Sequence, residues 1–498
     1  MLMADKSTLM VLIMAALNHG VLFGAEPLAR QPLFRVTDLN VGESQVLKLA
    51  DGSQANVKLL HIEETRDALR SALRLARVKV EVNGVIETIE SGNYRLPVTV
   101  GGVQIDCPAT QGLYPRHDLF EDSWGLDKDA RLRLWPKGSP WIEPGSFGYP
   151  LKQRWFANVT QAGNEPSYVM GEDAPTSSTI YYHAGNDIGG AEGLDEVVAA
   201  SDGLIISARG KTLPEYPDLP FYQQSSYATV YVLDERGWIY RYTHLKSIDP
   251  SLRLGEHIKI GQGVGRLGRE EGAGYYAHLH FDIKSRQPSG KWGVEDAYAF
   301  LWETYLRQYK PPIIAVARPH IVTWVGESVM LDGSRSWSAA GKIPKYEWTF
   351  GDGTAAIGSK VQRTYDKPGR YSEILKATDN RGRVAYDFAI VDVVERGRTN
   401  KPSPAMHAAY FPSLNIRPGD PVTFVVRTAA TIPSGETWDF GDGSPPVKVR
   451  SDASIGSRGE GYATTVHSFV KPGQYLVRAE HTTEAGALIT MRLHVPVE

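Results

Sequence analysis

Apolar and polar residues alternate in short runs over residues 31–150. A period of two places every second side chain on one face of a β-strand. Asp51-Gly52 and Asn83-Gly84 lie between such runs, where a tight hairpin turn needs residues that accept positive φ. The pattern predicts a β-rich domain with one helix, over residues 63–76, which are rich in Leu, Ala and Arg.

Residues 197–283 continue the strand pattern with tighter turns. Two strands bend at Asp202-Gly203, and a later apolar strand contains His278. A proline-rich loop occupies residues 211–226, and the spacing of apolar residues predicts an amphipathic helix over residues 294–309. The central region is therefore expected to be an antiparallel sheet closed by a helix.

A repeat follows Pro311-Pro312. The segment Trp-Thr-Phe-Gly-Asp-Gly at residues 348–353 returns as Trp-Asp-Phe-Gly-Asp-Gly at residues 438–443. Each copy lies among alternating strands and tight turns, which is typical of a small β-sandwich. Asp352 and Asp442 could bind calcium, but Gly-Asp-Gly forms a tight turn without any ion, and we prefer that interpretation.

These patterns predict a mainly β, multidomain fold. A chain of 498 residues is long enough for three or four domains of about 100–200 residues each. The expected divisions are a signal peptide, a β-rich accessory domain, an antiparallel β-sheet domain and two immunoglobulin-like β-sandwiches, over residues 1–25, 26–152, 153–310, 311–396 and 397–498.

The N-terminal segment has the features of a secretory signal peptide. Lys6 precedes an apolar run at residues 9–17, and Ala25 offers a cleavage site. An uncleaved membrane anchor is the alternative, but the run is shorter than the roughly 20 apolar residues that a spanning helix needs. We therefore expect a secreted, periplasmic or cell-envelope protein without a transmembrane span in the mature chain.

Charge and cysteine content exclude several classes of protein. The net charge is −3 and no basic tail is present, so nothing favours nucleic-acid binding. Cys107 is the single cysteine, which excludes an intrachain disulfide and a thiolate metal cluster. We expect Cys107 to be a buried, inert thiol. A metal site would have to use histidine and carboxylate ligands.

Five residues in the central region suggest a metal site. His183 and Asp187 lie in a glycine-rich stretch, His244 ends a strand-like run, and His278 and His280 alternate in an apolar strand. Alternate residues share one face of a strand, so His278 and His280 project into one cavity. The glycines around Asp187 favour a folded-back loop over a helix, and such a loop allows His183 and Asp187 to converge.

Two neutral imidazoles and one carboxylate, with a fourth position open to water, form a typical catalytic zinc site. Four histidines and one aspartate exceed that requirement. The two remaining histidines would handle protons and stabilise the charge on an attacked carbonyl. The residues alone therefore predict one Zn²⁺ per chain, and they admit both His278 and His280 as ligands.

The motifs resemble those of the lysostaphin/LytM family of zinc metalloendopeptidases. His-x-Gly-x-Asp, Tyr-x-His-Leu, Gly-x-x-Ile-x-x-Gly-Gln-x-Val-Gly and His-Leu-His-Phe occur in the family's order over residues 183–283. The resemblance implies peptide bonds of bacterial cell wall as the substrate. The long loop at 211–226 and Asp282, where the family often has glutamate, bear on substrate preference. The resemblance also implies zinc ligands at His183, Asp187 and His280 and catalytic histidines at His244 and His278.

The two C-terminal units resemble polycystic kidney disease (PKD) repeats, which are extracellular immunoglobulin-like modules. Such modules act as spacers or bind polymers and do no chemistry. We therefore expect the units beyond about residue 311 to be dispensable for hydrolysis. In the alternative, they pack across the active-site groove and shape it.

The sequence predicts an exported zinc endopeptidase that hydrolyses peptide bonds in peptidoglycan stem peptides or cross-bridges. Zinc would activate a water molecule, and His244 or His278 would take its proton. Cleavage of glycine-rich extracellular protein and non-catalytic binding in the cell envelope are two alternatives. The expected partner is peptidoglycan or another extracellular polymer, and the sequence indicates no oligomeric state.

Overall fold

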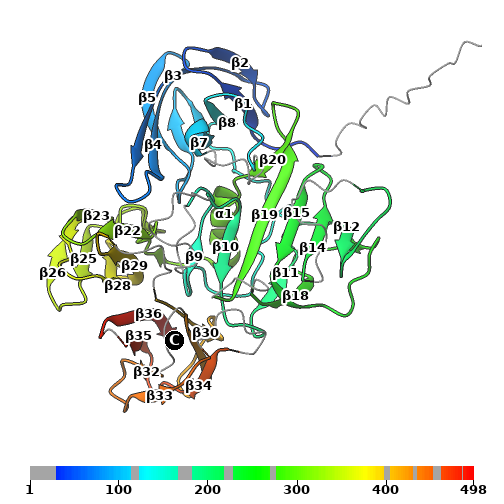
Figure 1. Ribbon diagram of the computed structural model, residues 1–498. Coiled ribbons are helices and arrows are strands. Elements are labelled where there is room, and N and C mark those ends of the chain that lie inside the picture. Colours follow the sequence, from blue (N-terminus) through cyan, green and yellow to red (C-terminus); the bar gives the residue numbers. More distant parts are fainter. Residues whose placement is uncertain are drawn as a thin grey trace, which may run out of the picture.

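The computed structural model describes residues 30–113, 123–165, 182–217, 228–269, 276–397, 404–429, 435–452, 461–484 and 486–498. The expected signal peptide and residues 218–226 of the proline-rich loop lie outside these ranges. Strands dominate the described residues (Figure 1), so the prediction of a mainly β, multidomain fold is confirmed. Among the described residues, no helix is long and apolar enough to cross a membrane.

The N-terminal unit, residues 30–136, contains two four-stranded sheets, in the orders β1-β8-β7-β6 and β2-β3-β4-β5. Buried side chains of both sheets, such as Val57, Val80 and Ile105, form one core. Cys107 belongs to this core, where burial raises the pKa of its thiol to about 12. The elements are β1 (Arg35–Leu39), β2 (Ser44–Lys48), β3 (Gln54–Arg66), β4 (Leu73–Val82), β5 (Val85–Ser91), β6 (Val98–Val100), β7 (Val103–Thr110), η1 (Gln111–Leu113) and β8 (Ala130–Pro136).

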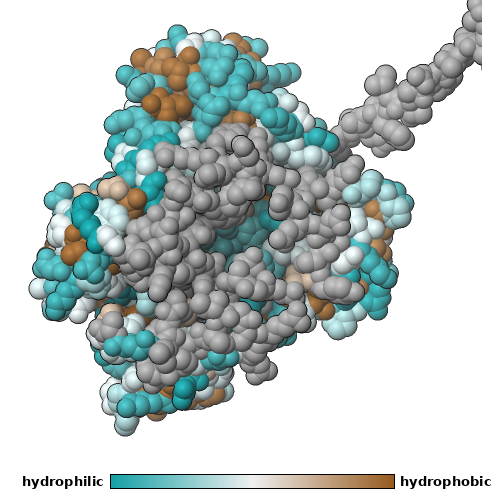
Figure 2. Space-filling model, viewed as in Figure 1, coloured by the Kyte–Doolittle hydropathy of each residue, from teal (hydrophilic) through white to brown (hydrophobic). Residues whose placement is uncertain are grey.

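The outer surface of this unit carries hydrophobic residues, visible as brown areas at the top of Figure 2. Val46, Val85 and Ile86 on the edge strands β2 and β5 are 60%, 49% and 54% exposed. Scattered exposed apolar side chains are usual on soluble proteins, so they define no binding surface by themselves.

The helix predicted over residues 63–76 is wrong. These residues end β3 and begin β4, which pair as antiparallel strands. Between the two strands, Asp67 Oδ1 accepts the backbone amides of Leu69 and Arg70 at 3.1 and 2.7 Å, which turns the chain. Helix propensity is worth less than about 1 kcal/mol per residue, so sheet pairing and the burial of Leu73 override it.

The central unit, residues 137–310, is built on a nine-stranded antiparallel sheet. Its order is β13-β12-β14-β15-β19-β10-β9, with β17 beside β12 and β20 beside β19, and a second sheet has the order β11-β18-β16. The strands are β9 (Thr160–Gln161), β10 (Asn186–Gly189), β11 (Glu196–Val198), β12 (Gly203–Ala208), β13 (Lys211–Thr212), β14 (Val230–Leu233), β15 (Ile239–Thr243), β16 (Leu245–Ile248), β17 (His257–Ile258), β18 (Gly263–Leu267), β19 (His278–Arg286) and β20 (Trp292–Glu295).

The helix α1 (Tyr298–Tyr309) packs against this unit. It begins later than predicted because Trp292–Glu295 form β20, which pairs with β19. Its buried face contacts Trp155 and joins the central core, which also takes in Phe34 and Trp135 of the N-terminal unit. The N-terminal unit therefore shares a core with the central unit and is not an isolated accessory.

Two β-sandwiches follow, each with its own core around a fully buried tryptophan, Trp348 in the first and Trp438 in the second. A parallel pairing of Arg370 with Ile489 joins β28 to β36 and makes one nine-stranded sheet across both sandwiches. The first sandwich has β21 (Ile313–Ile314), β22 (Ile321–Trp324), β23 (Ser328–Asp332), β24 (Trp337–Ser338), β25 (Lys345–Thr349), β26 (Ala355–Ile357), β27 (Lys360–Thr364), β28 (Gly369–Thr378) and β29 (Val384–Val394). The second has β30 (Ala405–Phe411), β31 (Val422–Ala429), β32 (Glu436–Asp439), β33 (Val447–Val449), β34 (Ala463–His467), β35 (Gly473–Thr482) and β36 (Leu488–Val497).

The second sandwich packs directly on the central unit. Its core includes Ala157, Val159 and Tyr276, which belong to the central unit. Figure 1 shows this sandwich, in orange and red, below the ends of β10 and β19. It therefore contacts the part of the sheet where the predicted metal site lies.

Candidate metal centre

The pairing of β10 with β19 places the aspartate and the second histidine of the predicted site side by side. Asp187 lies directly opposite His280 in the antiparallel register. His278, His280 and Asp282 occupy alternate positions of β19, so their side chains leave the same face of the sheet. One face of one strand pair therefore supplies most of the polar groups of the site.

His183 reaches the site from the loop that precedes β10. Residues 183–185 are loop and not helix, as the glycines predict. Gly185 has a φ of +113°, and a Cβ at this position would lie 2.8 Å from Asp282 Cβ and 3.1 Å from His280 Nε2. Only glycine permits this close approach without strain, and it allows the loop to fold over His280.

Three ligand atoms converge. Asp187 Oδ1 lies 3.0 Å from His183 Nε2 and 2.8 Å from His280 Nδ1, and the two nitrogens are 3.0 Å apart. All three side chains are buried. Two imidazole nitrogens directed at one carboxylate oxygen form a donor set that suits zinc, so the residues fit a metal ion. Among the described residues, they are the one group of histidine and acidic side chains close enough to hold a metal.

The other two predicted histidines lie beside these three residues. His244 follows β15 with a φ of +64°, which is uncommon for a residue other than glycine. Its ring centroid is 4.8 Å from that of His278 and 5.9 Å from that of His280. His278 Nε2 lies 3.5 Å from Asp187 Oδ2. All five residues predicted from the sequence are thus brought together.

The charges of the cluster follow from burial and proximity. Burial alone would raise the pKa of Asp187, but His183 and His278 hold it well below its ordinary value, so the carboxylate stays ionised. Burial lowers the pKa of both His244 and His278, which keeps these imidazoles neutral. Burial and Arg241 would lower the pKa of His280, yet hydrogen bonds to Asp187 and Asp282 raise it.

Asp282 and Arg241 hold the outer side of His280. Asp282 Oδ2 lies 2.9 Å from His280 Nε2, and Arg241 Nε donates to the same oxygen at 2.6 Å. Burial would raise the pKa of Asp282, but Arg241 and His280 lower it to about 2. Arg241 Nη2 lies 2.8 Å from the same ring nitrogen, so Asp282 and Arg241 together fix the Nε2 side of the ring and leave Nδ1 directed at Asp187.

Sequence analysis missed three residues of the site, Arg241, Tyr276 and Asp282. Arg241 lies opposite Asp282 in the β15–β19 register, and Tyr276 donates its hydroxyl to Asp187 Oδ2 at 2.9 Å. The alternation of His278, His280 and Asp282 could have placed Asp282 in the site. No local pattern marks Arg241 or Tyr276, because their positions depend on strand pairing.

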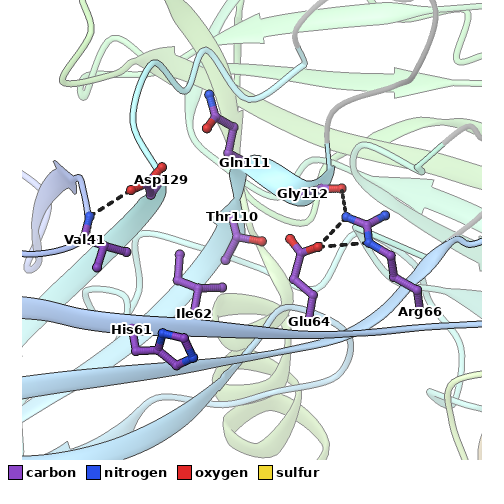
Figure 3. Close-up of a pocket in the computed structure, with 9 residues that line it drawn as sticks. All are labelled: Val41, His61, Ile62, Glu64, Arg66, Thr110, Gln111, Gly112 and Asp129. Carbon is purple, nitrogen blue, oxygen red and sulfur yellow. Dashed lines mark hydrogen bonds and ion pairs between the residues drawn. The ribbon is translucent and has the colours of Figure 1, made fainter.

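A pocket in the N-terminal unit lies apart from this cluster (Figure 3). Glu64 Oε2 accepts a hydrogen bond from Arg66 Nε at 2.9 Å, and Asp129 Oδ2 accepts the amide of Val41 at 2.8 Å. The isolated His61 lines the same pocket. Because its acidic groups are satisfied within the protein, the pocket offers no charge that calls for a ligand.

Comparison with known proteins agrees with the geometry. Residues 181–291 match the model of peptidase family M23, and residues 309–393 and 408–494 match models of the PKD domain. The chain therefore carries an M23 peptidase domain of the lysostaphin/LytM type, followed by two PKD domains. Both resemblances read from the sequence are confirmed.

Two solved structures are similar to parts of this chain. The catalytic domain of the antimicrobial peptidase lysostaphin from Staphylococcus simulans is 23% identical with a TM-score of 0.20, over 29% of this chain and 92% of that chain. Helicobacter pylori Csd3 is 15% identical with a TM-score of 0.20, over 47% of this chain and 56% of that chain.

A curated relative matches outside the peptidase domain. Collagenase ColA from Clostridium perfringens is 38% identical over 71 residues, which are 14% of this chain and 6% of the collagenase. This match falls in the PKD region. The chain thus spans a small fraction of the collagenase, and the match does not concern the metal cluster.

Proposed function

We propose that the protein is an exported zinc metalloendopeptidase that hydrolyses peptide bonds in peptidoglycan stem peptides or cross-bridges. The observation that carries the proposal is the convergence of His183, Asp187 and His280 beside two neutral histidines within an M23 peptidase domain. Export rests on residues 1–25, whose sequence has the features of a signal peptide.

The ligand set assigns a task to each residue. His183 Nε2, Asp187 Oδ1 and His280 Nδ1 would hold the zinc ion. When bound, zinc polarises the scissile carbonyl and makes water a stronger nucleophile. Asp282 and Arg241 fix the Nε2 side of His280, and Gly185 leaves room for the loop that carries His183.

His244 and His278 would move the protons of the reaction. Both are neutral at pH 7, so each can accept a proton from an attacking water and return it to the leaving amine. His278 Nδ1 donates to the Tyr276 carbonyl at 3.1 Å, which leaves Nε2 as the nitrogen that accepts a proton. Whichever of His244 and His278 does not accept the proton would stabilise the charge on the carbonyl oxygen.

A second candidate substrate is glycine-rich extracellular protein. The PKD region resembles that of a collagenase, which favours a protein polymer as the target of these domains. A third reading, in which the groove only binds, has less support because all five site residues are present. Digestion of purified cell wall and of an elastin-like protein, with product analysis, separates the three. New amino termini in cell-wall peptides support the proposal, and cleavage of the elastin-like protein alone refutes the peptidoglycan substrate.

Metal analysis tests the ligand assignment. His280→Ala should reduce stoichiometric zinc to a trace, because it removes one of three protein ligands. The exposed His257 lies outside the site, so His257→Ala is the matched control and should retain zinc. Undiminished zinc in the His280→Ala protein would refute the assignment.

Turnover measurements test the division of roles. His244→Ala and His278→Ala should keep zinc and lower kcat by roughly 100-fold or more, the usual contribution of general acid–base catalysis. A folded His278→Ala protein that loses zinc would show that His278 is a ligand.

A further inference from the structure

Tyr276 connects the metal cluster to the second PKD domain. Its hydroxyl donates to Asp187 Oδ2 at 2.9 Å, while Asp187 Oδ1 faces His183 and His280. The Tyr276 ring stacks on His278 with centroids 4.3 Å apart. One side chain therefore contacts a proposed metal ligand and a proposed catalytic histidine.

The second PKD domain contacts the far side of Tyr276. The ring centroid of His407, on β30, is 5.5 Å from that of Tyr276, and His407 is fully buried. Tyr276 also belongs to the core of this domain, together with Met406 and Ala408 of β30. The Tyr276 ring is thus held between the peptidase strand and the PKD strand.

The residue that separates Tyr276 from His278 is fixed from two sides. The Ala277 amide donates to Tyr462 Oη of the second PKD domain at 2.8 Å, and its carbonyl accepts the amide of Gly190 at 3.1 Å. Tyr462 Oη also lies 2.8 Å from His407 Nδ1. Since its oxygen accepts the Ala277 amide, its hydrogen is available to His407. Burial lowers the pKa of His407 to about 3, so the ring is neutral and can accept it.

We propose that the second PKD domain stabilises the metal centre: Tyr276 positions the Asp187 carboxylate, and His407 and Tyr462 hold Tyr276 and Ala277 in place. The inference rests on the proposed zinc site. A donor to the outer oxygen of a ligating carboxylate fixes its orientation, and loss of such a partner typically weakens metal binding about 10–100-fold. Tyr276 is a positioning residue, because it acts through Asp187.

The first test uses the full-length protein and measures zinc affinity by competition with a chelator. Tyr276→Phe removes the hydroxyl and keeps the ring. We expect zinc to bind at least about tenfold more weakly and the visible spectrum of the Co²⁺-substituted protein to change. We also expect kcat on a soluble peptide to fall more than KM rises, since the hydroxyl contacts a ligand and not the substrate.

The second test approaches the site from the PKD domain. Tyr462→Phe touches no proposed ligand, and it should weaken zinc binding in the same direction by a smaller factor. Tyr410→Phe is the matched control. Tyr410 is a buried tyrosine of the same domain whose hydroxyl donates to the His494 carbonyl at 2.8 Å. It should lower thermal stability without changing zinc affinity or the Co²⁺ spectrum.

The outcomes distinguish this inference from the proposed function. If the unaltered protein binds no zinc, both fail. If it binds zinc and cleaves peptide, but Tyr276→Phe and Tyr462→Phe match it in zinc affinity and Co²⁺ spectrum, the proposed function stands and the positioning role is overturned. Should Tyr462→Phe not fold, His407→Phe replaces it, because it keeps a ring against Tyr276 and removes the acceptor of Tyr462.

Discussion

The two PKD domains carry the same repeated motif and contact the peptidase domain in different ways. The first is attached near β9, where Arg318 Nη1 donates to the Thr160 carbonyl at 3.0 Å and the amide of His320 donates to Glu165 at 3.1 Å. The second extends its core to Tyr276, two residues before β19. Modules that look equal in the sequence therefore pack differently in the fold, and on our proposal only the second one affects the metal centre.

This difference changes the expectation drawn from the sequence. The PKD units were expected to be dispensable spacers, with packing across the groove as the alternative. The contacts of Ala277 and Tyr276 show that the second domain packs beside the cluster, and its effect on hydrolysis stays a prediction. The first domain contacts Glu165, whose carbonyl accepts the amide of His183 at 2.9 Å, so it approaches the cluster through the backbone and contacts none of the five clustered side chains among the described residues.

Removal of the second domain should have the largest effect. A chain that ends at Gly397 keeps the first PKD domain but exposes Ala157, Val159 and Tyr276. We expect kcat/KM on a small soluble peptide to fall roughly 100-fold, the scale of a misplaced active-site group. Steady-state kinetics, with circular dichroism as the control for folding, measures the loss. Unchanged kinetics would make both PKD domains spacers.

A change in the first domain should affect stability and not metal binding. Arg318→Met breaks a buried ion pair with Asp387, whose Oδ1 lies 3.2 Å from Arg318 Nη2. Removing one partner leaves the other charge buried and uncompensated, which costs about 3–5 kcal/mol of unfolding free energy. Denaturant unfolding should show this loss, while zinc affinity stays unchanged. A loss of zinc affinity equal to that of Tyr276→Phe would remove the distinction between the domains.

Replacing one buried alanine in each PKD domain by leucine compares the effects of the two domains on zinc binding. Ala409 is fully buried where the second domain meets Ala191, next to β10, whereas Ala389 is buried in the core of the first domain. Ala409→Leu and Ala389→Leu should each cost about 1–3 kcal/mol of unfolding free energy through overpacking. Only Ala409→Leu should also weaken zinc binding in chelator competition. Equal zinc affinities would contradict the prediction.

The last expected effect concerns pH at the same interface. Asp195 accepts the Ala191 amide at 2.7 Å, and burial raises the pKa of its carboxyl from 3.8 to about 7. Between these values the folded protein keeps a proton that the unfolded chain releases. Stability therefore falls as pH rises through this window, by at most about 1.4 kcal/mol per pH unit.

Asp195→Asn removes this titration. Denaturant unfolding at pH 5 and pH 8 should show a smaller drop in stability for the variant than for the unaltered protein. Equal drops would mean that Asp195 is ionised in the folded protein at both pH values.

Residues close together in the sequence made most of the site predictable. The glycines around Asp187 and the alternation of His278 with His280 led to five side chains that the fold brings together. The helix over residues 63–76 failed because pairing between strands overrides local propensity. Tyr462 could not be foreseen, since 185 residues separate it from Ala277 and two separate folding units must dock before they meet.

If Tyr462 and Ala277 act as proposed, their contact would also determine when the protein becomes active during biosynthesis. A ribosome delivers the peptidase residues 181–291 before residues 404–498. When the proposed metal ligands have just emerged from the ribosome, the residues that hold Tyr276 and Ala277 have not yet been synthesised. Competence for hydrolysis would come late, after the second PKD domain has folded, and a chain interrupted before that point would carry the ligands without the contacts that position them.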